Sequence, residues 1–187
     1  MIPETITTTA PDAIVYLMQN YANYNLWVNV TLINWLRTKP EEVLEQEVPS
    51  SFPSIKRTLV HILESQYYWL AVIRKDEKQR RDPFNGTLED AYKALLDHSA
   101  ALAAYVKDMT AADIQATTLV ESRWFRCNFQ HFEYITQIVT HGTYHRGQII
   151  TMGRNLGFTD APMTDYQYYN VYGKQSVAAD GGESHTG

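Results

Sequence analysis

Four long stretches of this 187-residue chain carry apolar side chains at alternating steps of three and four residues. An α-helix has about 3.6 residues per turn, so side chains with this spacing share one face. The stretches cover residues 11–37, 54 to between 74 and 78, 87–106 and 132–156. No series of alternating strand patterns accompanies them. The chain therefore predicts an all-α fold, with a four-helix bundle as its architecture.

Local signals indicate where the helices begin and end. Pro11 suits a first helical turn, Thr87 and Asp90 form a capping-box pattern, and Gly157 suits a C-terminal cap. Three further glycines lie inside the last helical stretch, where each lowers helix stability and indicates close approach of another helix or a ligand; they are Gly142, Gly147 and Gly153.

The remaining segments are shorter. Residues 38–53 form a connector in which Pro40 can start a short helix. Residues 110–130 are rich in strand formers, which predicts an irregular excursion or a short hairpin between the third and fourth helices. Residues 163–169 are expected to pack back on the bundle or on a partner. We expect one domain over residues 1–175 and a flexible tail over 176–187.

Composition excludes several classes of protein. The net charge is -5, with 21 acidic and 16 basic residues, which argues against a nucleic-acid partner. No apolar run approaches the roughly 18 residues of a membrane span, and the start of the chain lacks the pattern of a secretory signal. Cys127 is the lone cysteine, which fits a reducing compartment. We expect a cytoplasmic protein with no membrane partner.

Two histidines four residues apart, His141 and His145, lie in the apolar stripe of the fourth helix. This spacing places both rings on one face, one turn apart. Imidazoles that point into a core are costly unless a partner satisfies them, and a divalent metal would satisfy both. His61, in the second helix, offers a third ligand, and three histidines would leave a coordination position open. His98 is the fallback third ligand.

The histidine pair lacks the metalloprotease pattern, because Gly142 stands where that pattern has its glutamate base. Glu64, one turn after His61, is a candidate base or a residue near the ligands, although an exposed carboxylate is the plainer interpretation. Further candidates around the ligands are Asn25, Tyr144 and Gln148, since ligating histidines need an acceptor for the second ring nitrogen. Arg146 is interpreted either as a site for an anionic substrate or as a surface cation.

Three motifs resemble the DinB-like family of metal-dependent bundle proteins. They are Tyr24-Asn25-Leu26-Trp27-Val28-Asn29, then Leu59-Val60-His61 with Trp69 eight residues later, and His141-Gly142-Thr143-Tyr144-His145-Arg146-Gly147-Gln148. The third motif is the most specific. The resemblance covers residues 14 to about 170. Many relatives have a further histidine four residues before the first motif histidine, where this chain has Gln137.

The resemblance implies a four-helix bundle of DinB-like type that binds one divalent metal through His61, His141 and His145. It also implies a homodimer packed through bundle helices. Three imidazoles suit zinc, nickel, copper or iron, and we expect zinc or nickel. Relatives include transferases that use low-molecular-weight thiols, so such a thiol is a candidate cosubstrate.

Three hypotheses follow. The first is a metal-dependent enzyme, a thiol S-transferase or a hydrolase, that activates a thiol or water at the open position. The second is a non-catalytic protein that binds a metal or small ligand, in which the histidines stabilise the bundle. The third is a metal-free bundle whose histidines are hydrogen-bonded to Asn25, Gln148 or tyrosine side chains.

Overall fold

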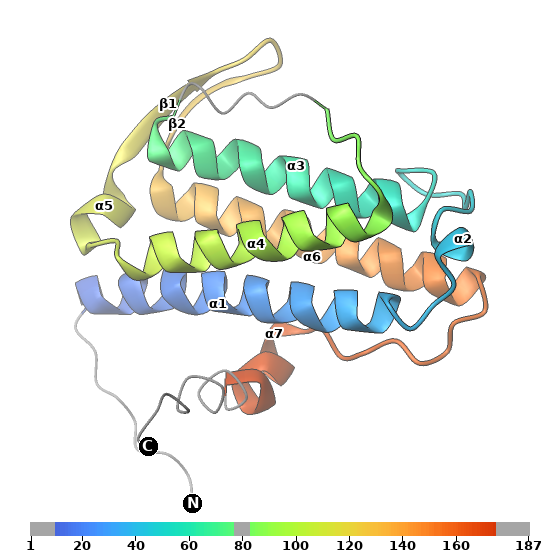
Figure 1. Cartoon of the computed structure of the whole chain (residues 1–187). Helices are drawn as coiled ribbons and strands as arrows, with labels where there is room; N and C mark the ends of the chain where they lie inside the picture. Colours follow the sequence, from blue (N-terminus) through green and yellow to red (C-terminus); the bar gives the residue numbers. More distant parts are fainter. Residues whose placement is uncertain (1–9, 77–82, 175–187) are drawn as a thin grey trace, which may run out of the picture.

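A computed structural model describes residues 10–76 and 83–174 and confirms the helical bundle. Helix α1 packs against α4 and α6, and helix α3 packs against the same two helices. Figure 1 shows that α1 and α6 run in one direction while α3 and α4 run in the other. The long helices are α1 (Ala10–Leu36), α3 (Ile55–Arg74), α4 (Leu88–Lys107) and α6 (His131–Asn155).

The expected hairpin lies between α4 and α6. Strands β1 (Thr117–Glu121) and β2 (Arg126–Gln130) pair antiparallel, with Thr117 opposite Gln130. The hairpin lies at one end of the bundle, alongside α3 (Figure 1). Sequence analysis missed the short helix α5 (Ala111–Gln115), although its capping box, formed by Thr110 and Asp113, is a readable signal.

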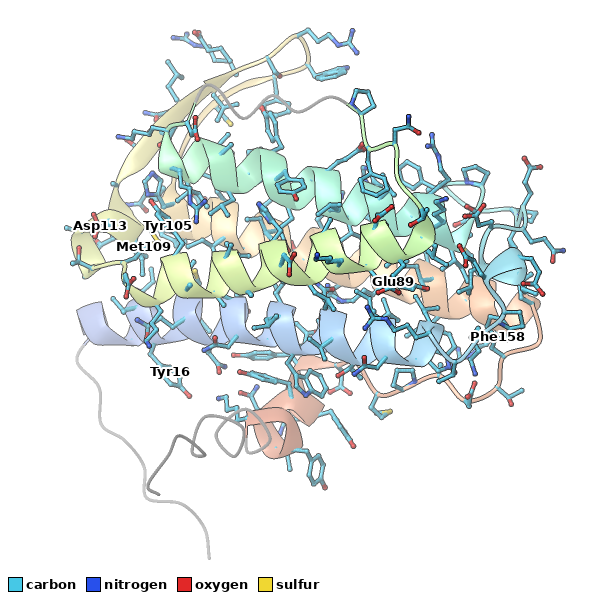
Figure 2. All side chains as sticks on the ribbon, in the orientation of Figure 1. Tyr16, Glu89, Tyr105, Met109, Asp113 and Phe158 are labelled. Atoms are coloured by element: carbon cyan, nitrogen blue, oxygen red, sulfur yellow. The ribbon has the colours of Figure 1, made fainter. Side chains whose placement is uncertain are left out.

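Helix termini follow the expected signals closely. Thr87 and Asp90 exchange hydrogen bonds as a capping box at the start of α4, and the short helix α2 (Glu41–Leu44) begins directly after Pro40. Gly157 has a φ of 91°, a left-handed conformation that glycine adopts without strain. It follows α6, at the end of the bundle where Phe158 lies (Figure 2).

The glycines inside α6 have different surroundings. A Cβ at Gly153 would lie 2.8 Å from the Trp35 ring, and one at Gly142 would lie 2.7 Å from the Arg146 guanidinium. Close approach of another helix is therefore confirmed at Gly153, where Trp35 belongs to α1, whereas the neighbour of Gly142 is a side chain of α6 itself. The prediction of close approach is wrong for Gly147, where a Cβ would meet no atom within 4 Å.

The apolar stripes form the core between the four long helices. Val28 and Leu32 of α1, Leu63 of α3 and Leu95 of α4 are at most 1% exposed. Burial of each such side chain stabilises the fold by about 1.5–3 kcal/mol. No helix among residues 10–76 and 83–174 is long and apolar enough to cross a membrane.

The segment after α6 packs back on the bundle, as predicted. It contains α7 (Tyr166–Tyr168) and the π-helical turn η2 (Tyr169–Gly173), which lies beside α1 (Figure 1). Tyr24 of α1 donates a hydrogen bond to the Thr164 carbonyl oxygen at 2.7 Å and contacts the rings of Tyr166 and Tyr169. The tail expected at 176–187 lies outside the described residues.

Candidate metal centre

Three histidine side chains meet between α3 and α6. His61 comes from α3, and His141 and His145 come from successive turns of α6. One ring nitrogen from each lies within 4.8 Å of the others, and the Nε2 atoms of His61 and His141 are 3.0 Å apart. Within the described ranges, this is the one group of three or more potential ligands close enough to hold a metal ion.

The cluster is set into the bundle rather than lying on its surface. The His145 side chain is buried, and His61 and His141 are half-buried. Ring centroids are 4.4 Å apart for His141 and His145 and 4.6 Å apart for His61 and His145. The four-residue spacing on α6 and the packing of α6 on α3 together produce this arrangement.

All three histidines favour the neutral state. Desolvation by burial is the main cause that lowers the pKa of each ring, and the pKa of His141 is about 4 when the effect of its neighbouring histidines is included. The neighbouring rings lower the pKa of His141 further, because two imidazolium charges repel each other. A neutral imidazole presents a nitrogen lone pair, which is the form that binds a metal.

Gln148 fixes the orientation of the His145 ring. Its Oε1 accepts a hydrogen bond from Nδ1 of His145 at 2.7 Å, and its Nε2 donates to Ser51 Oγ at 2.9 Å. Because an amide oxygen only accepts, Nδ1 carries the proton and Nε2 of His145 keeps its lone pair. This contact is the one that a metal-binding histidine needs at its second nitrogen.

The donor set fits a divalent ion. Three neutral imidazoles with no carboxylate in the group suit zinc or nickel. Imidazole nitrogens that share a zinc ion lie about 3.3 Å apart, given zinc–nitrogen distances of about 2.0–2.1 Å. The nitrogens here are 3.0 to 4.8 Å apart, so small side-chain movements would bring them to that spacing.

Aromatic rings enclose the cluster. The Phe52 ring stacks on His61 with centroids 4.2 Å apart and meets His145 edge-on at 5.6 Å. Tyr144 also meets His145 edge-on, although its side chain is 62% exposed. Sequence analysis missed Phe52, because nothing in the connector pattern distinguishes a residue that folds back over α3.

A cavity of about 920 Å³ reaches the cluster from the His61 side. Of the three histidines, His61 alone is among its lining residues, together with Phe52 and Glu64. The Glu64 carboxylate accepts a hydrogen bond from the Phe84 backbone amide at 3.3 Å. Glu64 is thus an exposed carboxylate beside the metal-ligand candidates, which agrees with both interpretations given above.

Arg146 lies in the core. Its side chain is 1% exposed, so the surface-cation interpretation is wrong, and it does not line the cavity, so an anionic substrate there would not meet it. Its Nη1 donates to Asn29 Oδ1 at 3.1 Å, and its Nη2 donates to Thr143 Oγ1 at 3.0 Å. Burial lowers the pKa of this guanidinium from its usual value.

Asn25 belongs to the same buried group rather than to the histidine cluster. Its Nδ2 donates to Gln66 Oε1 at 2.7 Å, and its Oδ1 lies 3.5 Å from Nη1 of Arg146. The hypothesis that Asn25 satisfies the clustered histidines is therefore wrong. We call the buried group that links all four long helices the polar layer; it comprises Asn25, Asn29, Gln66, His98, Ser99 and Arg146.

The other histidines lie apart from the cluster. His98 shares a hydrogen bond with Gln66 through Nδ1 at 2.9 Å, so it is a member of the polar layer and not the third ligand. His131, at the start of α6, shares one with Thr118 Oγ1 at 2.9 Å. His185 lies outside the described residues.

Replacement of Gln148 tests its role in orienting His145. We expect Gln148→Leu protein to bind zinc or nickel about 10–100-fold more weakly, because the second ring nitrogen loses its acceptor. Competition titration against a chromophoric chelator measures the change. Gln115→Leu is the matched control, because Gln115 is exposed on α5 and does not line the cavity. Equal affinities of the two variants would contradict the role of Gln148.

The stability of the metal-free protein should depend on pH through His141. Its pKa is about 4 in the folded protein against an ordinary value of 6.5. As the pH falls from about 6.5 to about 4, the unfolded chain binds a proton at His141 that the folded chain does not, so the free energy of unfolding decreases. Below about pH 4 both states are protonated, and this contribution no longer changes. Urea unfolding at stepped pH checks this. His141→Gln should give a shallower dependence, and an unchanged one would contradict the argument.

Comparisons with known proteins agree with this architecture. The model of the DinB family matches residues 12–175, a range that includes the four long helices almost entirely and all three clustered histidines. Protein DinB of Bacillus subtilis (strain 168) is 30% identical over 175 residues, and the match covers 78% of this chain and 89% of that protein. The chain belongs to the DinB family.

Proposed function

We propose that the protein is a metal-dependent enzyme in which zinc or nickel, held by His61, His141 and His145, activates a thiol or water. The observation that carries this proposal is the cluster of three neutral imidazoles at one end of a cavity. No carboxylate joins the group, so the ion would keep its full positive charge. That charge lowers the pKa of a thiol or water brought to the site.

The surrounding residues support this chemistry. Gln148 holds the His145 ring in the ligating tautomer. Phe52 stacks on the His61 ring and gives this part of the cavity an apolar wall. Glu64, one turn along α3 and in the cavity wall, would be the base that accepts a proton from the activated group. The cavity gives a substrate access to this end of the cluster, and a low-molecular-weight thiol would be the second substrate of a transferase.

An activity screen tests the proposal. Tag-free protein loaded with zinc or nickel is assayed against a panel of thiols with electrophiles and a panel of esters. We expect turnover that metal-free protein and His141→Ala protein lack. If protein with a full equivalent of metal shows only background turnover across both panels, the proposed enzymatic function is contradicted.

A non-catalytic metal-binding protein is the alternative, and the burial of the cluster favours it. His145 is 4% exposed, and the three ligands join α3 to α6, so a metal there would cross-link two helices. This alternative predicts a large rise in melting temperature with metal and no turnover. The enzyme hypothesis predicts turnover in addition to a rise in melting temperature.

We also propose a cytoplasmic homodimer. Apolar side chains remain exposed where η2 lies against α1: Tyr16 is 52% exposed and Tyr172 is 60% exposed. A second copy would cover them. Light scattering after size exclusion should give twice the mass of the chain, and Tyr172→Glu should reduce that mass; a wild-type monomer would contradict the proposal.

A further inference from the structure

The cavity beside the metal centre is a long groove rather than a round pocket. Its lining from α3 recurs every three or four residues, from Arg57 through His61, Glu64 and Tyr68 to Lys75, and therefore follows one face of the helix. At about 1.5 Å per residue, this stretch is roughly 27 Å long. Strand β1 supplies lining residues over the later part of the face, and Phe52 and Phe84 supply them over the earlier part.

Much of the groove lining is apolar. Tyr68 is 43% exposed and Leu119 of β1 is 50% exposed, and both line the groove together with Val60, Val72 and Phe84. Apolar side chains that stay exposed in a concave site are typical of a surface that a ligand covers.

Charge in the groove does not favour a highly charged ligand. The cationic side chains are Arg57 and Lys75, and the acidic ones are Glu64, Asp76 and Glu121. The two signs are nearly balanced and are spread along the groove, so neither sign of ligand charge gains strongly from them. A neutral or singly charged molecule with an apolar body fits this lining best.

We propose that the groove binds the substrate of the metal centre, an elongated molecule with an apolar alkyl or acyl body and its reacting group at the His61 end. This inference rests on the proposed function, because it assigns a substrate class to that site. The apolar body lies between Tyr68 and Leu119, and His61 marks the point where the groove meets the candidate ligands. A polar thiol cosubstrate is not the molecule that the groove fits.

Binding of dansyl-undecanoic acid to the metal-free protein tests the groove without any need for catalysis. We expect a saturable rise in dansyl fluorescence and competition by undecanol. Leu119→Glu should weaken binding by about tenfold or more, since it replaces an apolar contact with a charge. Leu17→Glu is the matched control, because Leu17 is 39% exposed on α1 and does not line the groove.

A second measurement tests the position of the ligand relative to the histidines. In cobalt-loaded protein, proton resonances at one end of undecanol should broaden more than those at the other end, and zinc-loaded protein should show no such gradient. Absence of saturable binding, equal binding by both Glu variants, or uniform broadening would overturn the proposal. If Leu119→Glu weakens probe binding but the wild type shows no turnover, the groove is a site for an apolar ligand. In that case only the proposed enzymatic function is contradicted.

Discussion

His141→Ala protein is expected to bind zinc or nickel more than about 100-fold more weakly than the wild type. Loss of a residue that only orients a ligand already costs about 10–100-fold in affinity, and removal of a ligand costs more. His141 Nε2 lies 3.0 Å from Nε2 of His61, within the group that would surround the ion. Competition titration with a chromophoric chelator measures the change, and His145→Ala should behave in the same way.

A histidine outside the cluster is the control for this prediction. His131→Ala removes an imidazole from the same helix, but His131 contacts Thr118 and is not in the cluster. We expect its metal affinity to equal that of the wild type, with circular dichroism to verify that each variant is folded. Equal losses in His131→Ala and His141→Ala would contradict a specific site.

Arg146→Ala should lower the free energy of unfolding of the metal-free protein by about 2–4 kcal/mol, because the change leaves a cavity and an unpaired buried acceptor. The side chain is 1% exposed, and Asn29 Oδ1 accepts its hydrogen bond at 3.1 Å. Gly142 leaves room for the guanidinium, since a Cβ there would lie 2.7 Å from Nη1. Urea unfolding of the two proteins gives the difference.

The Arg146→Met variant separates the contribution of side-chain volume to the free energy of unfolding from that of the guanidinium. No described carboxylate forms an ion pair with Arg146, whose contacts are amide and hydroxyl groups and the face of the Tyr24 ring. A buried cation without a counter-charge stabilises the fold little, so an apolar side chain of similar length should stay within about 1.5 kcal/mol of the wild type. A loss as large as that of Arg146→Ala would show instead that the guanidinium, with its charge and hydrogen bonds, is needed rather than the volume of the side chain.

Much of the fold follows from local sequence patterns. The stripe of Met18, Val28, Leu32 and Trp35 is buried along α1 as its spacing predicts, and the capping box at Thr87 begins α4. These features depend on residues within a few turns of one another, so they can be recognised from the sequence alone. Helix α5 was missed because a five-residue helix carries little periodicity.

The candidate site was predictable in part. The spacing of His141 and His145 predicts their shared face, but their meeting with His61 depends on how α3 packs against α6, which periodicity does not determine. For that reason the sequence left both His61 and His98 as candidates for the third ligand, and the family resemblance favoured His61. The burial of Arg146 could not be predicted from the sequence, because a cation beside a motif is usually exposed. Its hydrogen bond to the Asn29 amide depends on how α1 packs against α6.

The metal content of tag-free protein, measured by mass spectrometry after removal of bound ions and reloading with zinc or nickel, shows whether the three histidines form a metal site. We expect about one equivalent per chain in the wild type and almost none in His61→Ala protein, since His61 is the one member of the cluster that comes from α3. No metal in the wild type after reloading, or one equivalent retained without His61, would contradict a site formed by the three histidines.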